Sequence, residues 1–397
     1  MAKNSSVKRG ERIQVRIDRL AVGGRGVARH QGMVLFVSDA APGDLAEVEV
    51  TFLKKNFAEA ELTRVIEAAP SRMTPPCPVA GICGGCNWQH IVYEEQLRSK
   101  RQLVLESLRK FSGFHLDDDF VHPVVPSPKE FRYRNRIQLH YSGSRIGFYR
   151  RGSHEIVDID DCPITDERLS AMIPELRREL AHRKASRLEI YLTQDGKTAR
   201  RVSVRDAVND TEETEGPGAA GPAFSQVNTE QNENLVEYVR DLVGKLPEPK
   251  NIYDLYAGSG NFTFPIQRTW PTTSITGVEL SRASVQSANE RIEHEHLPQH
   301  FRFVCESVDT FIKGRRFGEE SLVLLDPPRT GCGPGVMTEL ASQKPRTIVY
   351  VSCHPATLSR DLKPLSETGY RLVSVRPFDM FPQTDHVETV VHLERST

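Results

Sequence analysis

Cys353 is the residue of this chain best placed to act as a nucleophile. It follows the apolar run RTIVYVS, which predicts a strand, and precedes the helix-compatible segment HPATLSRDL. The positive end of a helix lowers the pKa of a nearby thiol and so raises the fraction of thiolate, the reactive form. A lone cysteine is more often a buried structural residue, but its position at the end of a predicted strand favours catalysis.

Glu388 is the carboxylate that could work with this thiol. It opens the last predicted strand, ETVVHLE, where apolar surroundings should raise its pKa toward the working range of a general base. His386 and Asp385 are weaker candidates for the base. The alternative is that Glu388 is a surface residue on an edge strand.

A thiol and a base together suit methylation of carbon 5 of a uracil in RNA. The ring is electron-poor, so carbon 5 attacks a methyl donor only after a thiolate has added to carbon 6. The adduct carries an extra proton at carbon 5, which a base must remove before the thiolate can leave. We therefore assign Cys353 as the nucleophile and Glu388 as the base.

The segment NIYDLYAGSGNF predicts a cofactor site. Asp254 lies in an apolar strand, and Gly258 and Gly260 would let the backbone pass close to a ligand at the carboxyl end of that strand. Glu279 ends the next strand, where it could accept hydrogen bonds from ribose hydroxyls. The spacing lacks the third glycine of a dinucleotide site, which favours S-adenosylmethionine. A nicotinamide or flavin site and a glycine turn without a ligand are the alternatives.

A second enzyme hypothesis comes from the segment SLVLLDPPRTGC. Asp326 and the two prolines after it would shape a rigid pocket for a planar base. An aromatic residue after D-P-P would suggest methylation of an exocyclic amine, but Arg329 stands at that position. An amine-directed methyltransferase has no use for a nucleophilic thiol.

Four further cysteines could hold a metal centre. Cys77, Cys83 and Cys86 form C-x5-C-x2-C, and Cys162 follows in DIDDCPI. Four thiolates can bind zinc or a [4Fe–4S] cluster, and the spacing alone favours neither. Thiols without a metal are the third possibility. The odd total of seven cysteines argues against a disulfide framework.

The elements around these residues predict an α/β chain of three domains. Residues 1–70 alternate short strands with Gly/Pro turns, which indicates an OB-like β-barrel that binds RNA or only packs on its neighbour. Residues 71–222 hold the cysteine loop, strands with one helix between them, and the acidic, Gly/Pro-rich linker DAVNDTEETEGPGAAGP. Residues 223–397 alternate helices and strands, which predicts a Rossmann-like, largely parallel sheet that a hairpin closes.

Charge and hydropathy limit the partners. The chain has 52 basic and 53 acidic residues, so its net charge of −1 does not by itself indicate nucleic acid. The segment FRYRNRIQLHYSGSRIGFYRRG, however, mixes arginines with aromatic residues, which suits single-stranded RNA. A strand with a solvated charged face is the alternative. No run of residues is apolar enough for a bilayer span or a signal peptide, so we expect a cytoplasmic protein that binds no membrane.

Nearly the whole chain resembles the RNA 5-methyluridine methyltransferase family, specifically its iron–sulfur branch that methylates 23S ribosomal RNA. The motifs that carry the resemblance are VSCHPATLSRDL, HVETVVHLER, DLYAGSGNF and FSQVN, and GGRGVARHQGMVLFVSDAAPGDLAEVEV resembles a TRAM domain. The resemblance implies a [4Fe–4S] cluster on the four cysteines and S-adenosylmethionine contacts from Gln226, Tyr256, Gly258, Asn261, Glu279, Ser307 and Asp326. Ser307 departs from the Asn or Asp usual in the family.

The resemblance also implies the partner. A barrel and a cysteine cluster together favour 23S ribosomal RNA, and tRNA remains the alternative because relatives with the cluster can act on it. We expect the chain to act as a monomer. A third hypothesis is an iron–sulfur RNA-binding protein whose catalytic fold no longer works.

Overall fold

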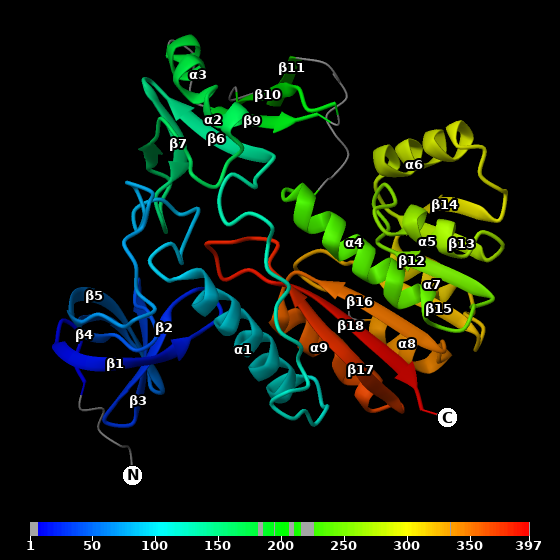
Figure 1. Cartoon of the computed structure of the whole chain (residues 1–397), viewed down its shortest axis with the longest axis horizontal. Coiled ribbons are helices and arrows are strands. Elements are labelled where there is room, and N and C mark those ends of the chain that lie inside the picture. Colours follow the sequence, from blue (N-terminus) through cyan, green and yellow to red (C-terminus); the bar gives the residue numbers. More distant parts are fainter. Residues whose placement is uncertain are drawn as a thin grey trace. The chain divides into compact units, whose positions relative to one another are not determined.

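The computed structural model describes residues 7–181, 186–193, 195–205, 210–215, 226–333 and 335–396 (Figure 1). The chain divides into two compact units that interleave along the sequence. The first unit comprises Met1–Ser99, Lys129–Gly221 and Phe381–Asp385, and the second comprises Lys100–Pro128, Pro222–Met380 and His386–Thr397. The division into three domains stays a prediction.

The first unit begins with the predicted barrel. Its strands close in the order β1-β2-β3-β5-β4, with β3 and β5 parallel and the other pairs antiparallel. Buried residues alternate with more exposed ones along β3 and β4, so every second side chain fills the barrel. The strands are β1 (Arg12–Leu20), β2 (Gly26–His30), β3 (Met33–Ser38), β4 (Leu45–Leu53) and β5 (Phe57–Glu67).

The rest of the first unit is built on a six-stranded antiparallel sheet in the order β11-β10-β9-β6-β7-β8. Its elements are β6 (Arg136–Ser142), β7 (Arg145–Tyr149), β8 (Ile156–Asp158), α2 (Glu167–Ser170), α3 (Ile173–Leu180), β9 (Ser186–Leu192), β10 (Thr198–Arg205) and β11 (Asp210–Glu215). The single helix expected between these strands is wrong: two short helices form, and Pro174 stands in the first turn of α3, where its missing N–H is tolerated.

The acidic linker prediction is also partly wrong. Strand β11 lies inside the predicted linker and pairs with β10, with Glu215 opposite Arg200. The segment forms a strand because β10 provides a partner for it, which the composition of the segment alone did not reveal. Residues 206–209 and 216–222 of the predicted linker lie outside the described residues. The boundary between the two units falls after Gly221.

The second unit contains the predicted doubly wound sheet, in the order β14-β13-β12-β15-β16-β18-β17. Strands β12 to β16 pair in parallel, while β18 and β17 are antiparallel and close the sheet, so the parallel core and the closing hairpin are confirmed. The strands are β12 (Asn251–Leu255), β13 (Ser274–Glu279), β14 (Phe301–Cys305), β15 (Ser321–Leu325), β16 (Thr347–Ser352), β17 (Tyr370–Phe378) and β18 (Glu388–Arg395).

Helices surround this sheet, and its central strands are apolar. All residues of β15 and β16 are buried, as expected of parallel strands covered on both faces. The helices are α4 (Thr229–Gly244), α5 (Thr263–Thr269), α6 (Arg282–His294), α7 (Val308–Lys313), α8 (Val336–Gln343) and α9 (Pro355–Ser366), together with the part of α1 (Tyr93–Phe111) that follows Ser99. None of the helices in the described part of the chain has the length and apolar character needed to cross a bilayer.

Candidate active site

The structure brings the three chemistry-bearing residues of the second unit to one edge of its sheet. Asp326 directly follows β15 and Cys353 directly follows β16. These strands are parallel, so their carboxyl ends lie at the same edge. Strand β18 runs antiparallel to β16 with Thr389 opposite Ser352, which brings its first residue, Glu388, to that edge beside Cys353.

The environment of Cys353 corrects the expected direction of its pKa. Burial raises the pKa of this thiol to about 12, and the negative charges of Glu388 and Asp326 add to the rise, while Arg329 opposes it. Cys353 does precede α9, whose N-cap is His354. The expected lowering is wrong because loss of water and two carboxylates outweigh the helix end.

The two carboxyl groups influence each other as well as the thiol. Glu388 is 3% exposed, and burial together with the nearby charge of Asp326 holds its pKa well above the usual range, as predicted for a base. Burial and the charge of Asp254 raise the pKa of Asp326 to about 7. Two carboxylates this close resist double ionisation, so one proton stays at this edge of the sheet near neutral pH.

The weaker candidates for the base lie in different environments. Nη2 of Arg329 lies 3.0 Å from Nδ1 and 3.2 Å from Nε2 of the His386 ring. Asp385 belongs to the first unit, where its carboxylate accepts hydrogen bonds from the Gly23 N–H at 2.7 Å and from the Asn87 side-chain amide at 2.8 Å. The Asp385 carboxylate therefore anchors the segment Phe381–Asp385 within the first unit.

The glycine turn after β12 has the geometry of a ligand-binding loop. Gly258 and Gly260 adopt φ of 56° and 94°, and a Cβ on Gly260 would lie 2.5 Å from the Phe264 ring. The Glu279 carboxylate accepts the N–H of Gly258 at 3.0 Å and the N–H of Ser281 at 2.7 Å. The carboxylate predicted to meet the ribose is thus fixed against the turn by two backbone donors.

The other predicted cofactor residues lie around this edge or have structural partners. Tyr256 has φ of 68°, a strained value for a non-glycine residue. Asn261 exchanges two amide hydrogen bonds with Asn232, each of 3.0 Å. The Ser307 hydroxyl caps α7 by accepting the Thr310 N–H at 3.2 Å. Gln226 precedes α4 by three residues.

A hydrogen bond between Asp254 and Thr263 joins the two sides of the glycine turn. The Thr263 hydroxyl donates to Asp254 at 2.5 Å, and both residues are buried. Burial raises the pKa of Asp254 to about 7, with a smaller contribution from the charge of Glu279, and the Thr263 bond opposes the rise.

The sequence analysis missed the residue that ties the Asp326 loop to the Cys353 helix. Oδ2 of Asp361 accepts the Cys332 N–H and the Tyr350 hydroxyl, both at 2.7 Å. Its neighbour Arg360 donates to the Thr330 carbonyl at 2.8 Å. An acidic residue on the otherwise mostly apolar buried face of α9 was the signal that could have revealed Asp361.

The four predicted metal ligands lie in the first unit. Burial raises the pKa of Cys77 and Cys83, and raises that of Cys86 to about 12, and neighbouring members of the set add to each rise. Cys162 takes part as a charged neighbour of the other three. Within the described ranges, however, no three His, Cys, Asp or Glu side chains form a group that could hold a metal ion. The cluster stays a prediction.

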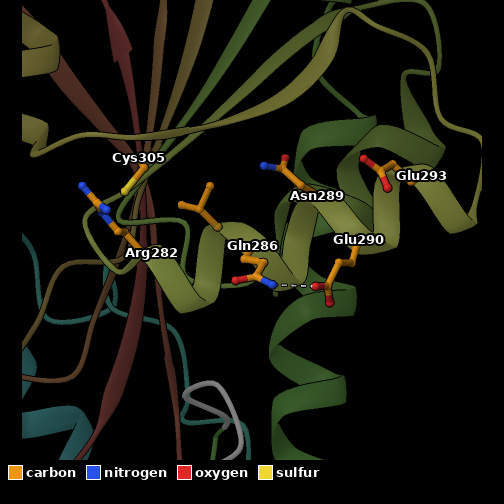
Figure 2. Close-up of a pocket in the computed structure, with 7 residues that line it drawn as sticks. Arg282, Gln286, Asn289, Glu290, Glu293 and Cys305 are labelled. Carbon is orange, nitrogen blue, oxygen red and sulfur yellow. Dashed lines mark hydrogen bonds between the residues drawn. The ribbon is translucent and has the colours of Figure 1, made fainter. Parts of the chain in front are cut away.

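One cavity of the second unit lies away from the predicted nucleophile. It measures about 460 Å³ and is lined by α6 and by Cys305, the last residue of β14 (Figure 2). Figure 2 shows Arg282 and Cys305 at one end and Glu293 at the other. None of the predicted site residues lines this cavity.

Known proteins share this architecture. Residues 218–396 match the family described as tRNA (Uracil-5-)-methyltransferase, and residues 6–63 match the TRAM domain. The chain is 44% identical over 393 residues to an RNA methyltransferase of Bdellovibrio bacteriovorus, covering 97% of this chain and 95% of that one. It is 32% identical over 430 residues to the 23S rRNA (uracil(1939)-C(5))-methyltransferase RlmD of Photorhabdus laumondii, covering 96% of each.

A solved structure is similar over the full length. The tRNA (uracil-54, C5)-methyltransferase of Pyrococcus abyssi, in complex with S-adenosyl-L-homocysteine, superposes with a TM-score of 0.70 at 25% identity. The match covers 96% of this chain and all of that one. The chain therefore belongs to the RNA uracil-5-methyltransferase family, in the form that carries an N-terminal TRAM domain, and is an enzyme of that class.

Proposed function

We propose that this chain transfers a methyl group from S-adenosylmethionine to carbon 5 of a uridine in 23S ribosomal RNA, with Cys353 as the nucleophile. The observation that carries the proposal is the meeting of Cys353, Glu388 and Asp326 at one sheet edge. The relative from Photorhabdus laumondii, whose name specifies uracil in 23S rRNA, supports the substrate.

The first step is addition of the Cys353 sulfur to carbon 6 of the uracil. The thiol must lose its proton for this, and the guanidinium of Arg329 is the nearby charge that lowers its pKa. As the S–C6 bond forms, the C5–C6 π electrons move toward the 4-carbonyl and give an enolate. Carbon 5 would then bond to the methyl group that S-adenosylmethionine supplies when bound, while the sulfonium S–CH3 bond breaks and S-adenosylhomocysteine leaves.

The second step returns the ring to aromatic form. Glu388 in its ionised form takes the proton from carbon 5, the C5–C6 double bond re-forms, and the S–C6 bond breaks to release the thiolate. The raised pKa of Glu388 makes it a stronger proton acceptor than an exposed carboxylate. The cofactor would be held by the turn that contains Gly258 and Asn261, and by Glu279 at the end of β13. Further contacts would come from Gln226, Tyr256, Ser307 and Asp326.

Substitution of the two catalytic residues tests this assignment. Cys353→Ala should abolish methyl transfer, and RNA with 5-fluorouridine should form a covalent adduct with the wild-type chain but not with Cys353→Ala. Glu388→Ala should let the methylated adduct accumulate, because addition and transfer precede proton removal. Cys305→Ala, at an exposed cysteine, is the matched control and should stay active. Full activity of Cys353→Ala would sink the proposal in favour of amine methylation.

Transfer RNA is the second candidate substrate. The Pyrococcus abyssi enzyme, whose name specifies uracil-54 of tRNA, is similar along nearly the whole chain and favours it. Mass mapping of 5-methyluridine in ribosomal and transfer RNA, from cells with and without the gene, decides between them. If cells without the gene lose 5-methyluridine from tRNA alone, tRNA replaces ribosomal RNA as the proposed substrate.

We also propose that Cys77, Cys83, Cys86 and Cys162 hold a [4Fe–4S] cluster. The donor set supports the proposal, because the first unit contains four cysteines without a disulfide, the number of thiolates that such a cluster needs. Methyl transfer needs no electron, so the role is structural or RNA-orienting. Anaerobic purification should give visible absorbance and about four iron atoms per chain, lost in Cys86→Ser. A colourless chain with one bound zinc would contradict the cluster.

A chain that binds RNA but gives no calorimetric signal with S-adenosylmethionine would instead be a binding protein.

A further inference from the structure

We propose that a groove between the end of α1 and the face of α9 binds single-stranded RNA next to the target uridine. The inference rests on the proposed function and assigns an RNA contact to the second unit. The groove measures about 510 Å³, and the residues that matter to the argument are Arg109, Lys110, Phe111, His115, Arg360 and Lys363. We call it the α1–α9 groove.

The two helices that form the groove are fixed to each other. The hydroxyls of Ser107 on α1 and Ser359 on α9 are 3.0 Å apart, and both residues are buried. On α9, Ala356, Arg360 and Lys363 recur at intervals of four and three residues, so they share one helix face. The groove therefore has a fixed width and one basic wall.

The charge of the groove suits a polyanion. Four of its nine lining residues are arginine or lysine, a fifth is His115, and none of the nine is acidic. Arg109 pairs with Asp118 and Arg360 with Asp361, each at 2.7 Å. Lys110 and Lys363 are exposed, and within the described part of the chain they form no ion pair. Two ammonium groups are thus available for phosphates.

An exposed ring distinguishes this groove from a site for a small anion. Phe111 is 49% exposed, which is unusual for a phenylalanine, and the Lys110 ammonium lies 4.9 Å from its ring centroid. An aromatic ring beside cations is the arrangement with which proteins stack bases and neutralise phosphates of single strands. Inorganic phosphate has no surface that needs such a ring.

The groove begins close to the nucleophile in sequence and along the helix. Ala356 is three residues after Cys353, and Lys363 is two helical turns further. At the rise of an α-helix, the basic wall extends over roughly 5–15 Å from Cys353 along the axis. An RNA strand whose uridine is unstacked into the active site must continue nearby, and the α1–α9 groove offers it a path.

The experiment measures RNA affinity of the full chain by fluorescence anisotropy. The groove variant is Lys110→Ala/Lys363→Ala, and its control is Lys245→Ala/Lys313→Ala, which removes the same charge at exposed lysines of the same unit. With an oligouridine of about 20 nucleotides, the groove variant should lose about 1.4 from the slope of log affinity against log salt, since each phosphate contact to a single strand contributes about 0.7. The control should keep the wild-type slope.

Phe111 provides an independent arm. Phe111→Ala should weaken oligouridine binding roughly tenfold, and Phe111→Trp should restore it, because an indole also stacks. Equal affinities and slopes for the groove and control pairs, or no binding of oligouridine by the wild type, overturn the groove. Methyl transfer by the wild type, assayed in the same samples, tests the proposed function separately. The groove proposal is also overturned if inorganic phosphate displaces oligouridine at the same concentration from the groove variant and from the wild type.

Discussion

At the scale of single residues, Cys353 is kept in its unreactive form by its neighbours. A thiol becomes a nucleophile only as a thiolate, yet burial and the charges of Glu388 and Asp326 favour the protonated form. Only Arg329 among the charges that act on it pulls the other way. These surroundings therefore keep the Cys353 thiol protonated in the protein without substrate.

Glu388→Gln should make Cys353 easier to alkylate, although it removes the proposed base. Loss of the negative charge lowers the pKa of the thiol, so the iodoacetamide profile should move to lower pH and the rate at pH 10 should rise about five- to tenfold. The rate is followed by mass spectrometry of the peptide that contains Cys353. Glu293→Gln, at an exposed residue of α6, should leave the profile unchanged. Arg329→Ala should move it to higher pH, and a Glu388→Gln profile identical to that of the wild type would refute the placement of Glu388 beside the thiol.

The sequence predicted the residues of this site better than their protonation. Cys353 and Asp326 could be found because each directly follows an apolar run, and parallel strands bring such ends to one edge. Glu388 could be found because it opens the last apolar run, whose strand lies antiparallel to β16. The pKa of Cys353 could not be found, since it depends on charges that residues 326 and 388 add from distant parts of the sequence.

At the scale of elements, Asp361 connects three parts of the site. It lies on α9, accepts from Tyr350 on β16, and accepts from the backbone of Cys332 in the loop after Asp326. That loop also carries Arg329, whose carbonyl accepts the Thr357 hydroxyl of α9 at 3.3 Å. These hydrogen bonds therefore connect the loop to the helix next to Cys353.

Asp361→Ala should lower both stability and turnover. It leaves the Cys332 N–H and the Tyr350 hydroxyl without acceptors in a buried place, which costs about 2–4 kcal/mol in the free energy of unfolding. Tyr350→Phe removes one donor and leaves no orphan hydroxyl, so it should cost about 1 kcal/mol. Urea unfolding measures both, and equal losses for the two variants would show that Asp361 is not the centre of the network.

The ion pair between Lys100 and Asp379 is a second device at this scale. Nζ lies 2.5 Å from Oδ1, and both side chains are fully buried in the second unit, where they join α1 to the residue after β17. Lys100→Met should destabilise the unit by about 3–5 kcal/mol, because it strands a buried carboxylate. The double variant Lys100→Met/Asp379→Leu should recover much of this loss. A double variant no better than the single one would mean that the pair itself contributes the stability.

Element positions followed from the sequence where continuous apolar runs alternate with helical segments. The parallel strands β12 to β16 were predicted because each is a short apolar run between helical segments. The break between α2 and α3 and the strand β11 were missed. One depends on where Pro174 falls within a helix, and the other depends on a partner strand rather than on its own composition.

At the scale of the whole molecule, Phe381–Asp385 belongs to the first unit although the residues on both sides belong to the second. Asp385 secures it by accepting the Gly23 N–H from a turn of the barrel and the Asn87 amide from the cysteine loop. The Trp88 N–H donates to the Gln383 carbonyl at 3.0 Å in the same place. The segment is therefore held at its middle and at its carboxyl end.

Asp385→Ala should loosen this segment without unfolding the sheet of the second unit. We expect the Gly23 amide to exchange with solvent at least tenfold faster, since the loss of a hydrogen bond to a charged acceptor costs about 1.5–3 kcal/mol. Hydrogen exchange resolved by mass spectrometry measures this. Amides of β15 and β16 serve as the internal reference and should keep their protection. Unchanged exchange at Gly23 would remove Asp385 from the role given to it here.

The interleaved sequence of the two units limits how the enzyme can be divided or recombined. A cut in the chain near residue 222 would leave Lys100–Pro128 attached to the wrong fragment, and Phe381–Asp385 attached to the other. Fragments made there should not behave as separate folded pieces, and a hybrid with a relative needs several junctions instead of one. Exchange of either unit between relatives therefore requires coordinated changes at several places in the sequence.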